Sequence, residues 1–196
     1  MYIPKHFLET DADKLAAFID AHAFGALVTI AAGRPFATHI PFVYERHAGR
    51  LFGHVARANP QWQHLTNGAD ALVMFQGPHA YISPTWYVTP GVPTWDYVAV
   101  HVYGSARAIE DKAVTKRHVE QLAARYESGN QPPWVPEYDE RNLHGIVAIE
   151  IRIKEIQGKF KVSQNRPAGD RARVAAKLQA SGSENDLAVA RLIPLD

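Results

Sequence analysis

The sequence predicts a mainly β fold, in which peripheral helices surround a closed or half-closed barrel. Six or seven short apolar or alternating runs, joined by tight turns, carry this prediction. The regular exchange of strand and helix that builds a parallel sheet does not occur, nor does a glycine-rich GxGxxG or phosphate-loop pattern. We therefore expect an antiparallel barrel rather than a doubly wound sheet.

Composition narrows the class further. The chain has 196 residues, of which 46% are hydrophobic, and its 21 basic and 20 acidic residues nearly cancel. This predicts one main domain over residues 1–180 and a short helix or tail over 181–196. The absence of cysteine, of a signal-peptide pattern and of a long apolar run predicts a cytoplasmic protein with no membrane partner.

The first elements follow from capping and periodicity. A capping pattern and helically spaced apolar residues predict a helix over 11–22. Strands over 26–31 and 36–44, with a turn at 33–35, predict a β-hairpin. A third strand over 50–55 extends this meander, which is how barrels commonly begin.

The middle of the chain mixes short strands with irregular backbone. Asn59 as N-cap and the following proline predict a helix that ends near residue 68. Two short strands over 71–75 and 79–82 are predicted, separated by a turn at Gly77 and Pro78. The proline-rich segment 83–94 is predicted to be a functional loop.

Longer elements are predicted in the second half of the chain. We expect a strictly alternating strand, an amphipathic helix whose inner stripe includes His118, a Pro-rich connector and the clearest strand of the chain. These are residues 97–104, 111–127, 128–139 and 145–153. A helix over 170–179 and a last short helix ending at Ile193 complete the chain.

Residues 159–166 form the most informative cluster of the sequence. They hold three cations, a hydroxyl and two carboxamides directly after the last strand. Lysine and arginine supply charge, and the neutral polar groups supply directed hydrogen bonds, so the cluster suits an anion and especially a phosphate. A solvated charged turn is the alternative. Arg57, at the start of a predicted helix, allows the same two interpretations.

Histidines and aromatic residues are the other candidates for a site. Strand residues His39, His54 and His101 either line a ligand cavity or have structural roles, and their spacing predicts no metal site. Trp86 and Trp95, beside several tyrosines, either pack the interior or form a wall for a flat conjugated ring. No pattern of a hydrolase is present.

Five ordered motifs carry a resemblance to a known family. They are residues 1–7, 51–60, 81–87, 92–97 and 159–165. In these motifs the chain resembles the PaiB-type proteins, described as FMN-binding negative transcriptional regulators. The similarity runs from Met1 to about Arg173.

The resemblance implies a split β-barrel related to pyridoxamine-phosphate oxidases, with FMN bound at a homodimer interface. Carried over by position, the residues that border the flavin are Thr38, His39, Pro41, His54, Ala56, Asn59 and Trp62. Those that complete its polar rim are Lys159, Lys161, Ser163 and Gln164. The other half of the pocket is assigned to Trp86, Trp95 and His101.

The same resemblance implies a repressor of transcription, although the near-neutral charge gives no support for direct DNA binding. An FMN-dependent oxidoreductase on the same fold is the alternative, because bound flavin performs electron chemistry without a conventional catalytic set. A haem-binding or haem-degrading split barrel is a third hypothesis. Whether the protein is an enzyme stays open at this point.

Overall fold

The computed structural model describes residues 1–65, 68–132, 134 and 140–195. Its strands are β1 (Leu8–Glu9), β2 (Phe24–Ala31), β3 (Arg34–Pro41), β4 (Val43–Glu45), β5 (Arg50–Ala56), β6 (Ala69–Ile82), β7 (Thr94–Ile109) and β8 (Ile146–Lys161). Its α-helices are α1 (Ala12–Ala21), α2 (Lys112–Glu127), α3 (Ala168–Ser181) and α4 (Glu184–Leu192). Its 3-10 helices are η1 (Lys5–Phe7), η2 (Arg46–Ala48), η3 (Pro60–Leu65), η4 (Pro84–Trp86) and η5 (Glu140–Gly145). The predicted mainly β class is confirmed.

The chain divides into two compact units that interleave along the sequence. Unit 1 comprises Met1–Phe18, Gln76–Val100 and Gln157–Asp196, and unit 2 comprises Ile19–Phe75 and His101–Ile156. The sheet order is β3-β2-β6-β7-β8-β5-β4, with β1 paired to β8. Strands β6, β7 and β8 each pass from one unit into the other, so each unit has its own part of these strands.

In unit 2 the β2–β3 hairpin is antiparallel, with Leu27 opposite Thr38. Strand β5 pairs antiparallel with β8 over its whole length, so that Phe52 lies opposite Glu150. Side chains on one face of β5 and β8 point into the interior of the sheet. On the other face, Phe52 and Ala148 pack with Ile109 and with Val114 of α2. Helix α2 therefore covers the outer face of these strands.

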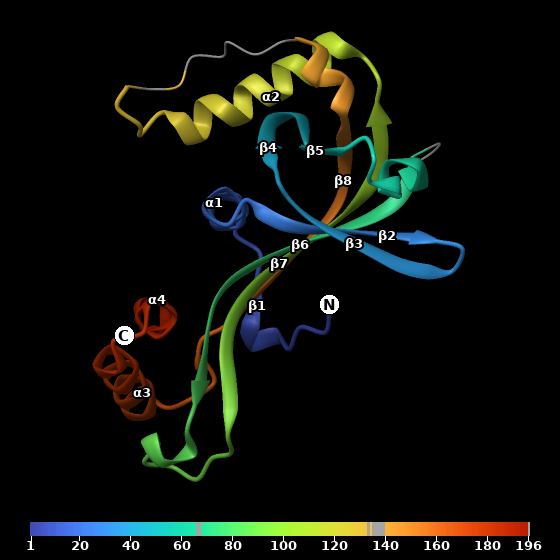
Figure 1. The fold of residues 1–196 in the computed structure, drawn as a ribbon. Helices are drawn as coiled ribbons and strands as arrows, with labels where there is room; N and C mark the ends of the chain where they lie inside the picture. The colour runs from blue at the N-terminus through green and yellow to red at the C-terminus, as the bar shows by residue number, and fades with distance from the viewer. Residues whose placement is uncertain (66–67, 133, 135–139, 196) are drawn as a thin grey trace. The chain divides into compact units, whose positions relative to one another are not determined.

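Unit 1 has a smaller core. Its β1 strand pairs with the end of β8, and Phe18 of α1 packs edge to face against Phe160 at 5.6 Å between ring centroids. Figure 1 shows α3 and α4 side by side near the C-terminus. Asp170 of α3 accepts from the backbone N–H of Val88 at 2.6 Å and thereby ties α3 to the 83–94 loop. In the described part of the chain, no helix combines the length and the apolar character that crossing a membrane requires.

The alternation predicted for β7 is confirmed. Val98, Val100 and Val102 are fully buried, and the residues between them are half-buried. The turn predicted at Gly77 and Pro78 is wrong, because β6 runs through both residues. A Cβ atom at Gly77 would lie 2.6 Å from Cε2 of Phe18. This glycine thus serves close packing rather than a change of chain direction.

Other boundaries differ in ways that have local causes. The predicted helix from Asn59 is the 3-10 helix η3, which ends at Leu65. Of its predicted end near residues 67 and 68, residue 67 lies outside the described residues. The single strand predicted over 36–44 is interrupted at Phe42, whose N–H donates to the carbonyl of Ala23 at 2.9 Å. Strand β8 is longer than predicted, and it includes Lys159 and Lys161. The helix predicted over 170–179 is α3, the last helix is α4, and the connector 128–139 is only partly described.

Candidate functional site

The residues predicted to contact a flavin occur in both units. Unit 2 contains Thr38, His39, Pro41, His54, Ala56, Asn59, Trp62 and His101. Unit 1 contains Trp86, Trp95, Lys159, Lys161, Ser163 and Gln164. Each unit thus has its own group of candidate residues.

In unit 2, Asn59 joins strand β3 to the η3 helix. Its Nδ2 donates to Oγ1 of Thr38 at 3.0 Å, and its Oδ1 accepts from the backbone N–H of Gln61 at 2.9 Å. An asparagine that accepts from the first turn of a helix is a good N-cap, as the sequence predicted. The structure therefore brings Thr38 and Asn59 together.

Gln61, which the sequence analysis did not single out, locks η3 onto the β2–β3 hairpin. Its side chain is fully buried, and Nε2 lies within hydrogen-bonding distance of the carbonyl of Leu27 (2.9 Å), Oγ1 of Thr29 (3.2 Å) and the carbonyl of Phe36 (3.2 Å). These partners are 25 to 34 residues away along the chain. A local pattern has no means of indicating them.

Arg57 and Trp62 form the second contact at η3. Nε of Arg57 donates to the carbonyl of His144 at 2.8 Å, and Nη2 donates to the carbonyl of Ile146 at 3.2 Å. The indole N–H of Trp62 donates back to the carbonyl of Arg57 at 3.0 Å, and the guanidinium lies 5.8 Å from the ring centroid. Nη1 of Arg57 has no partner among the described residues, and Arg57 is exposed.

The predicted histidines of unit 2 contact different elements. His54 is half-buried, and its ring meets that of His118 from α2 edge to face, with 6.0 Å between centroids. Burial lowers the pKa of His54, and its Nδ1 has no hydrogen-bond partner in the described part of the chain. His39 is exposed and stacks on Phe24 at 6.2 Å, whereas Pro41 is half-buried and Ala56 is exposed.

In unit 1, Lys161 and Ser163 converge on the buried carboxylate of Asp96, and we call these three residues the Asp96 network. Oγ of Ser163 donates to Oδ2 at 2.6 Å, and Nζ of Lys161 lies 3.2 Å from Oδ1. Nζ of Lys161 also donates to Oγ1 of Thr94 at 2.9 Å. Ser163 has a left-handed φ of 62°, which is uncommon for a residue other than glycine. The sequence predicted this grouping of Lys161 with Ser163 but not its carboxylate partner.

The remaining residues of the 159–166 cluster also have partners within unit 1. Nζ of Lys159 donates to the carbonyl of Tyr2 at 3.1 Å and lies 5.1 Å from the ring centroid of Tyr97. Gln164 folds back on β8, accepting from the N–H of Val162 at 2.8 Å and donating to the carbonyl of Phe160. The cluster thus shapes its own turn, and its contact with a phosphate stays a prediction.

The aromatic candidates are also distributed. Trp95 is 55% exposed and lies 5.9 Å from the ring of Tyr81, edge to face. Trp86 ends η4, and its carbonyl accepts from Nε of Arg173 at 2.9 Å. In unit 2, His101 is half-buried, burial lowers its pKa, and its Nδ1 has no partner among the residues described.

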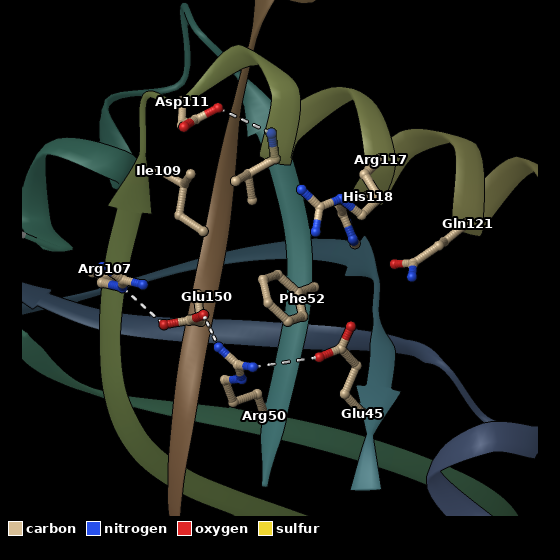
Figure 2. Close-up of a pocket in the computed structure, with 11 residues that line it drawn as sticks. Glu45, Arg50, Phe52, Arg107, Ile109, Asp111, Arg117, His118, Gln121 and Glu150 are labelled. Carbon is tan, nitrogen blue, oxygen red and sulfur yellow. Dashed lines mark hydrogen bonds and ion pairs between the residues drawn. The ribbon is translucent and has the colours of Figure 1, made fainter. Parts of the chain in front are cut away.

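A second buried carboxylate, missed by the sequence analysis, organises unit 2. Oε1 of Glu150 accepts from Nε of Arg107 at 2.8 Å, and Oε2 accepts from Nη1 of Arg50 at 2.9 Å (Figure 2). We call these three residues the Glu150 network. The only sequence signal is a charged residue at position 150 between two isoleucines of the clearest strand.

Comparison with known proteins identifies relatives across the chain. A family model described as "Putative FMN-binding domain" matches residues 1–155. The chain is 39% identical over 200 residues to the "Protease synthase and sporulation protein PAI 2" of Bacillus subtilis, covering 98% of this chain and 96% of that protein.

Solved structures share the fold. The flavocytochrome Anf3 from Azotobacter vinelandii superposes with a TM-score of 0.66 at 17% identity, covering 81% of this chain and 72% of that one. A Listeria innocua protein described as "Putative Pyridoxamine 5'-phosphate oxidase" gives 0.51 at 19% identity, covering 75% and 96%. The predicted split β-barrel is therefore confirmed.

Proposed function

The chain belongs to the FMN-binding domain family of PaiB-type proteins and takes FMN as its cofactor, and from that premise we propose that it acts as a negative regulator of transcription. The observation that carries the proposal is the similarity to the Bacillus PAI 2 protein, which extends over 98% of this chain. Similarity over the full length of both chains supports a shared role better than a match of one domain would.

The polar groups of unit 2 fit a flavin nucleotide. Nδ1 of His54 and Nη1 of Arg57 lack partners among the described residues, and His39 and Ala56 are exposed. A neutral imidazole offers one donor and one acceptor to the polar edge of an isoalloxazine ring, and a guanidinium suits a phosphate. We therefore propose that the unit 2 candidates contact FMN, with Arg57 added to the predicted set.

In unit 1, Lys159 is a better candidate for the FMN phosphate than Lys161. Lys161 is already paired with Asp96, whereas Lys159 has no carboxylate partner among the described residues. Its side chain is 8% exposed and is held between the rings of Tyr2 and Tyr97. Its charge is therefore not neutralised within its own unit, which favours an anionic ligand.

A comparison of FMN with riboflavin, which lacks the phosphate, tests this assignment. We expect Lys159→Gln to raise the Kd for FMN about tenfold more than the Kd for riboflavin, because one charge-assisted hydrogen bond to phosphate is lost. Lys161→Gln is the matched control, and we expect it to leave the ratio of the two Kd values unchanged. Equal losses for both ligands in Lys159→Gln, measured by flavin fluorescence titration, would contradict a role in phosphate binding.

Repression is tested separately by measuring DNA binding and by measuring transcript levels. A near-neutral net charge of +1 gives no general attraction to DNA, so we propose that regulation proceeds through FMN binding and a homodimer rather than through a basic surface. The measurement is a mobility shift with genomic fragments at physiological salt, with and without FMN, beside a transcription assay in cells that lack the gene. Unchanged transcript levels in those cells would overturn the regulatory proposal.

An FMN-dependent oxidoreductase is the second candidate, and the split-barrel fold is compatible with it. When bound, the isoalloxazine ring itself accepts and donates electrons. Steady oxidation of NADH or NADPH by the FMN-loaded protein, abolished when FMN is removed, would favour the enzyme over the regulator. The homodimer, the cytoplasmic location and the assignment of residues 1–180 to one FMN-binding domain stay predictions.

A further inference from the structure

Unit 2 contains a cavity of about 380 Å³, and none of the residues that line it is among those proposed to contact FMN. Its nearest approach to them is at His118, whose ring centroid lies 6.0 Å from that of His54. It lies between helix α2 and the outer face of β5, β7 and β8, and Figure 2 shows the side chains that line it. A volume of this size is within the range of small-molecule sites in proteins.

The carboxylates around this cavity already have partners. Both oxygens of Glu150 accept from arginines, as described above, and Oε2 of Glu45 lies 3.9 Å from Nη2 of Arg50. Oδ1 of Asp111 caps α2 by accepting from the N–H groups of Ala113 and Val114 at 2.8 and 3.1 Å. Glu150, the buried carboxylate of this lining, therefore has no oxygen left for a cationic ligand.

The cavity's polar groups without partners are mainly donors. Within the described part of the chain, Arg117 makes no hydrogen bond or ion pair, and the buried Nε of Arg50 has no acceptor. His118 is only 2% exposed, and neither of its ring nitrogens has a partner among the described residues. Burial, followed by the charge of His54, lowers the pKa of His118 to about 4, so the ring is neutral at pH 7 and supplies one donor and one acceptor.

Part of the lining is apolar. The ring of Phe52 lies 5.6 Å from that of His118, and Ile109 and Val114 pack with Phe52. In Figure 2 the side chains of His118 and Gln121 extend from α2 toward Phe52 and the Glu150 network. An anionic group with an apolar body is complementary to such a mixture of free donors and buried carbon.

We propose that this cavity binds a small monocarboxylate with an aromatic or branched apolar body. Arg117 pairs with the carboxylate, His118 hydrogen-bonds the ligand, and Phe52, Ile109 and Val114 contact its apolar part. Guanidinium–carboxylate pairing supplies directed, charge-assisted hydrogen bonds, which gives the site its preference for carboxylates. The site does not depend on the FMN proposal.

Benzoate is the probe, titrated into the full-length protein with excess FMN present and followed by protein ¹⁵N NMR. We expect saturable shifts in α2 and β5 with a Kd in the millimolar range or below, and at least tenfold weaker binding of benzamide, its neutral analogue. Shifts confined to β3 and η3, or equal binding of benzamide, would overturn the proposal. Inorganic phosphate that binds while benzoate does not would also overturn it.

Variants assign the interaction to named residues. Arg117→Gln is expected to weaken benzoate about tenfold or more, and His118→Phe, which keeps a ring against Phe52, is expected to weaken it several-fold. Lys112→Gln removes one cation from an exposed position of the same helix outside the cavity and should leave the Kd unchanged. An Arg117→Gln protein that keeps its α2 amide spectrum and binds benzoate as tightly as the natural sequence contradicts the proposal.

Discussion

Asp96 in unit 1 and Glu150 in unit 2 are both almost fully buried, with 1% and 4% of their surface exposed, yet their pKa values shift in opposite directions. Burial acts to raise the pKa of both carboxyls. At Asp96 it outweighs the hydrogen bond from Ser163 and the charge of Lys161, so the pKa is raised. At Glu150 the hydrogen bonds and charges of Arg107 and Arg50 together outweigh burial, so the pKa is lowered.

The two networks contribute to the stability of their units in opposite ways. The Glu150 network holds a fully formed charge between two guanidiniums and borders a cavity, whereas the Asp96 network has one lysine and one hydroxyl. A buried carboxylate with two cations stabilises the folded state as an anion. Its removal leaves Arg107 without a carboxylate partner among the described residues and leaves Arg50 with only its 3.9 Å pair to Glu45. When the folded-state pKa of a buried carboxyl group is raised, ionisation of that group lowers the free energy of unfolding.

The largest effect should come from Glu150→Gln. We expect the free energy of unfolding at pH 7 to fall by about 3 kcal/mol, because Arg50 and Arg107 lose their shared acceptor. The exposed fraction of the Arg107 side chain, 62%, keeps the loss from being larger, since solvent screens that ion pair. The measurement is urea unfolding of the full chain.

The matched control for that experiment is Glu110→Gln, which changes an exposed carboxylate of the same unit. Because the folded-state pKa of Glu150 is lowered, its stabilisation is present above the unfolded pKa and is lost as pH falls through the folded pKa. The difference in the free energy of unfolding between Glu150→Gln and Glu110→Gln should therefore shrink below about pH 4. A difference that stays constant down to about pH 3 would contradict an ionised Glu150.

Next in size is the pH dependence that His118 imposes on unit 2. Its folded-state pKa of about 4 lies below the ordinary value of 6.5, so stability is complete above pH 6.5 and falls as pH drops toward 4. The loss approaches about 3 kcal/mol, at about 1.4 kcal/mol per pKa unit. Unfolding curves of His118→Phe over this range should lack this slope, and an unchanged slope would mean that another group causes it.

Local features of the fold could be predicted from the sequence, whereas contacts between distant segments could not. The alternation of β7 was predictable because each valine is buried by its own strand's geometry, and the burial of His118 was predictable because it lies on the inner stripe of α2. Glu150 could not be paired in advance, since its partners are 43 and 100 residues away and depend on the pairing of strands. Gly77 was misassigned for the same reason, because the residue that needs its small size is Phe18.

The candidate site was predictable to a similar extent. Capping chemistry correctly identified Asn59 as an N-cap. The composition of residues 159–166 predicted that Lys161 and Ser163 contact an anionic ligand, and in the structure both contact Asp96. The carboxylate that these two residues share is 65 to 67 residues away, in a strand whose aspartate is not distinguished by local pattern. An anion-binding motif and a motif that binds the protein's own aspartate have the same composition, so the distinction requires the fold.

The smallest effect, and the one that separates the two networks most sharply, should come from Asp96→Asn. At pH 7 we expect a change in the free energy of unfolding within about 1 kcal/mol and on the stabilising side, because the raised pKa of Asp96 means that its charge opposes folding. Asparagine can still accept from Lys161 through Oδ1, and its Nδ2 can donate to the hydroxyl of Ser163. The gain should shrink as pH falls below the folded-state pKa and vanish below the unfolded-state pKa, where the natural carboxyl is protonated in both states. A loss at pH 7 as large as that of Glu150→Gln would show that Asp96 is held as a stabilising anion, and the contrast between the two units would then be wrong.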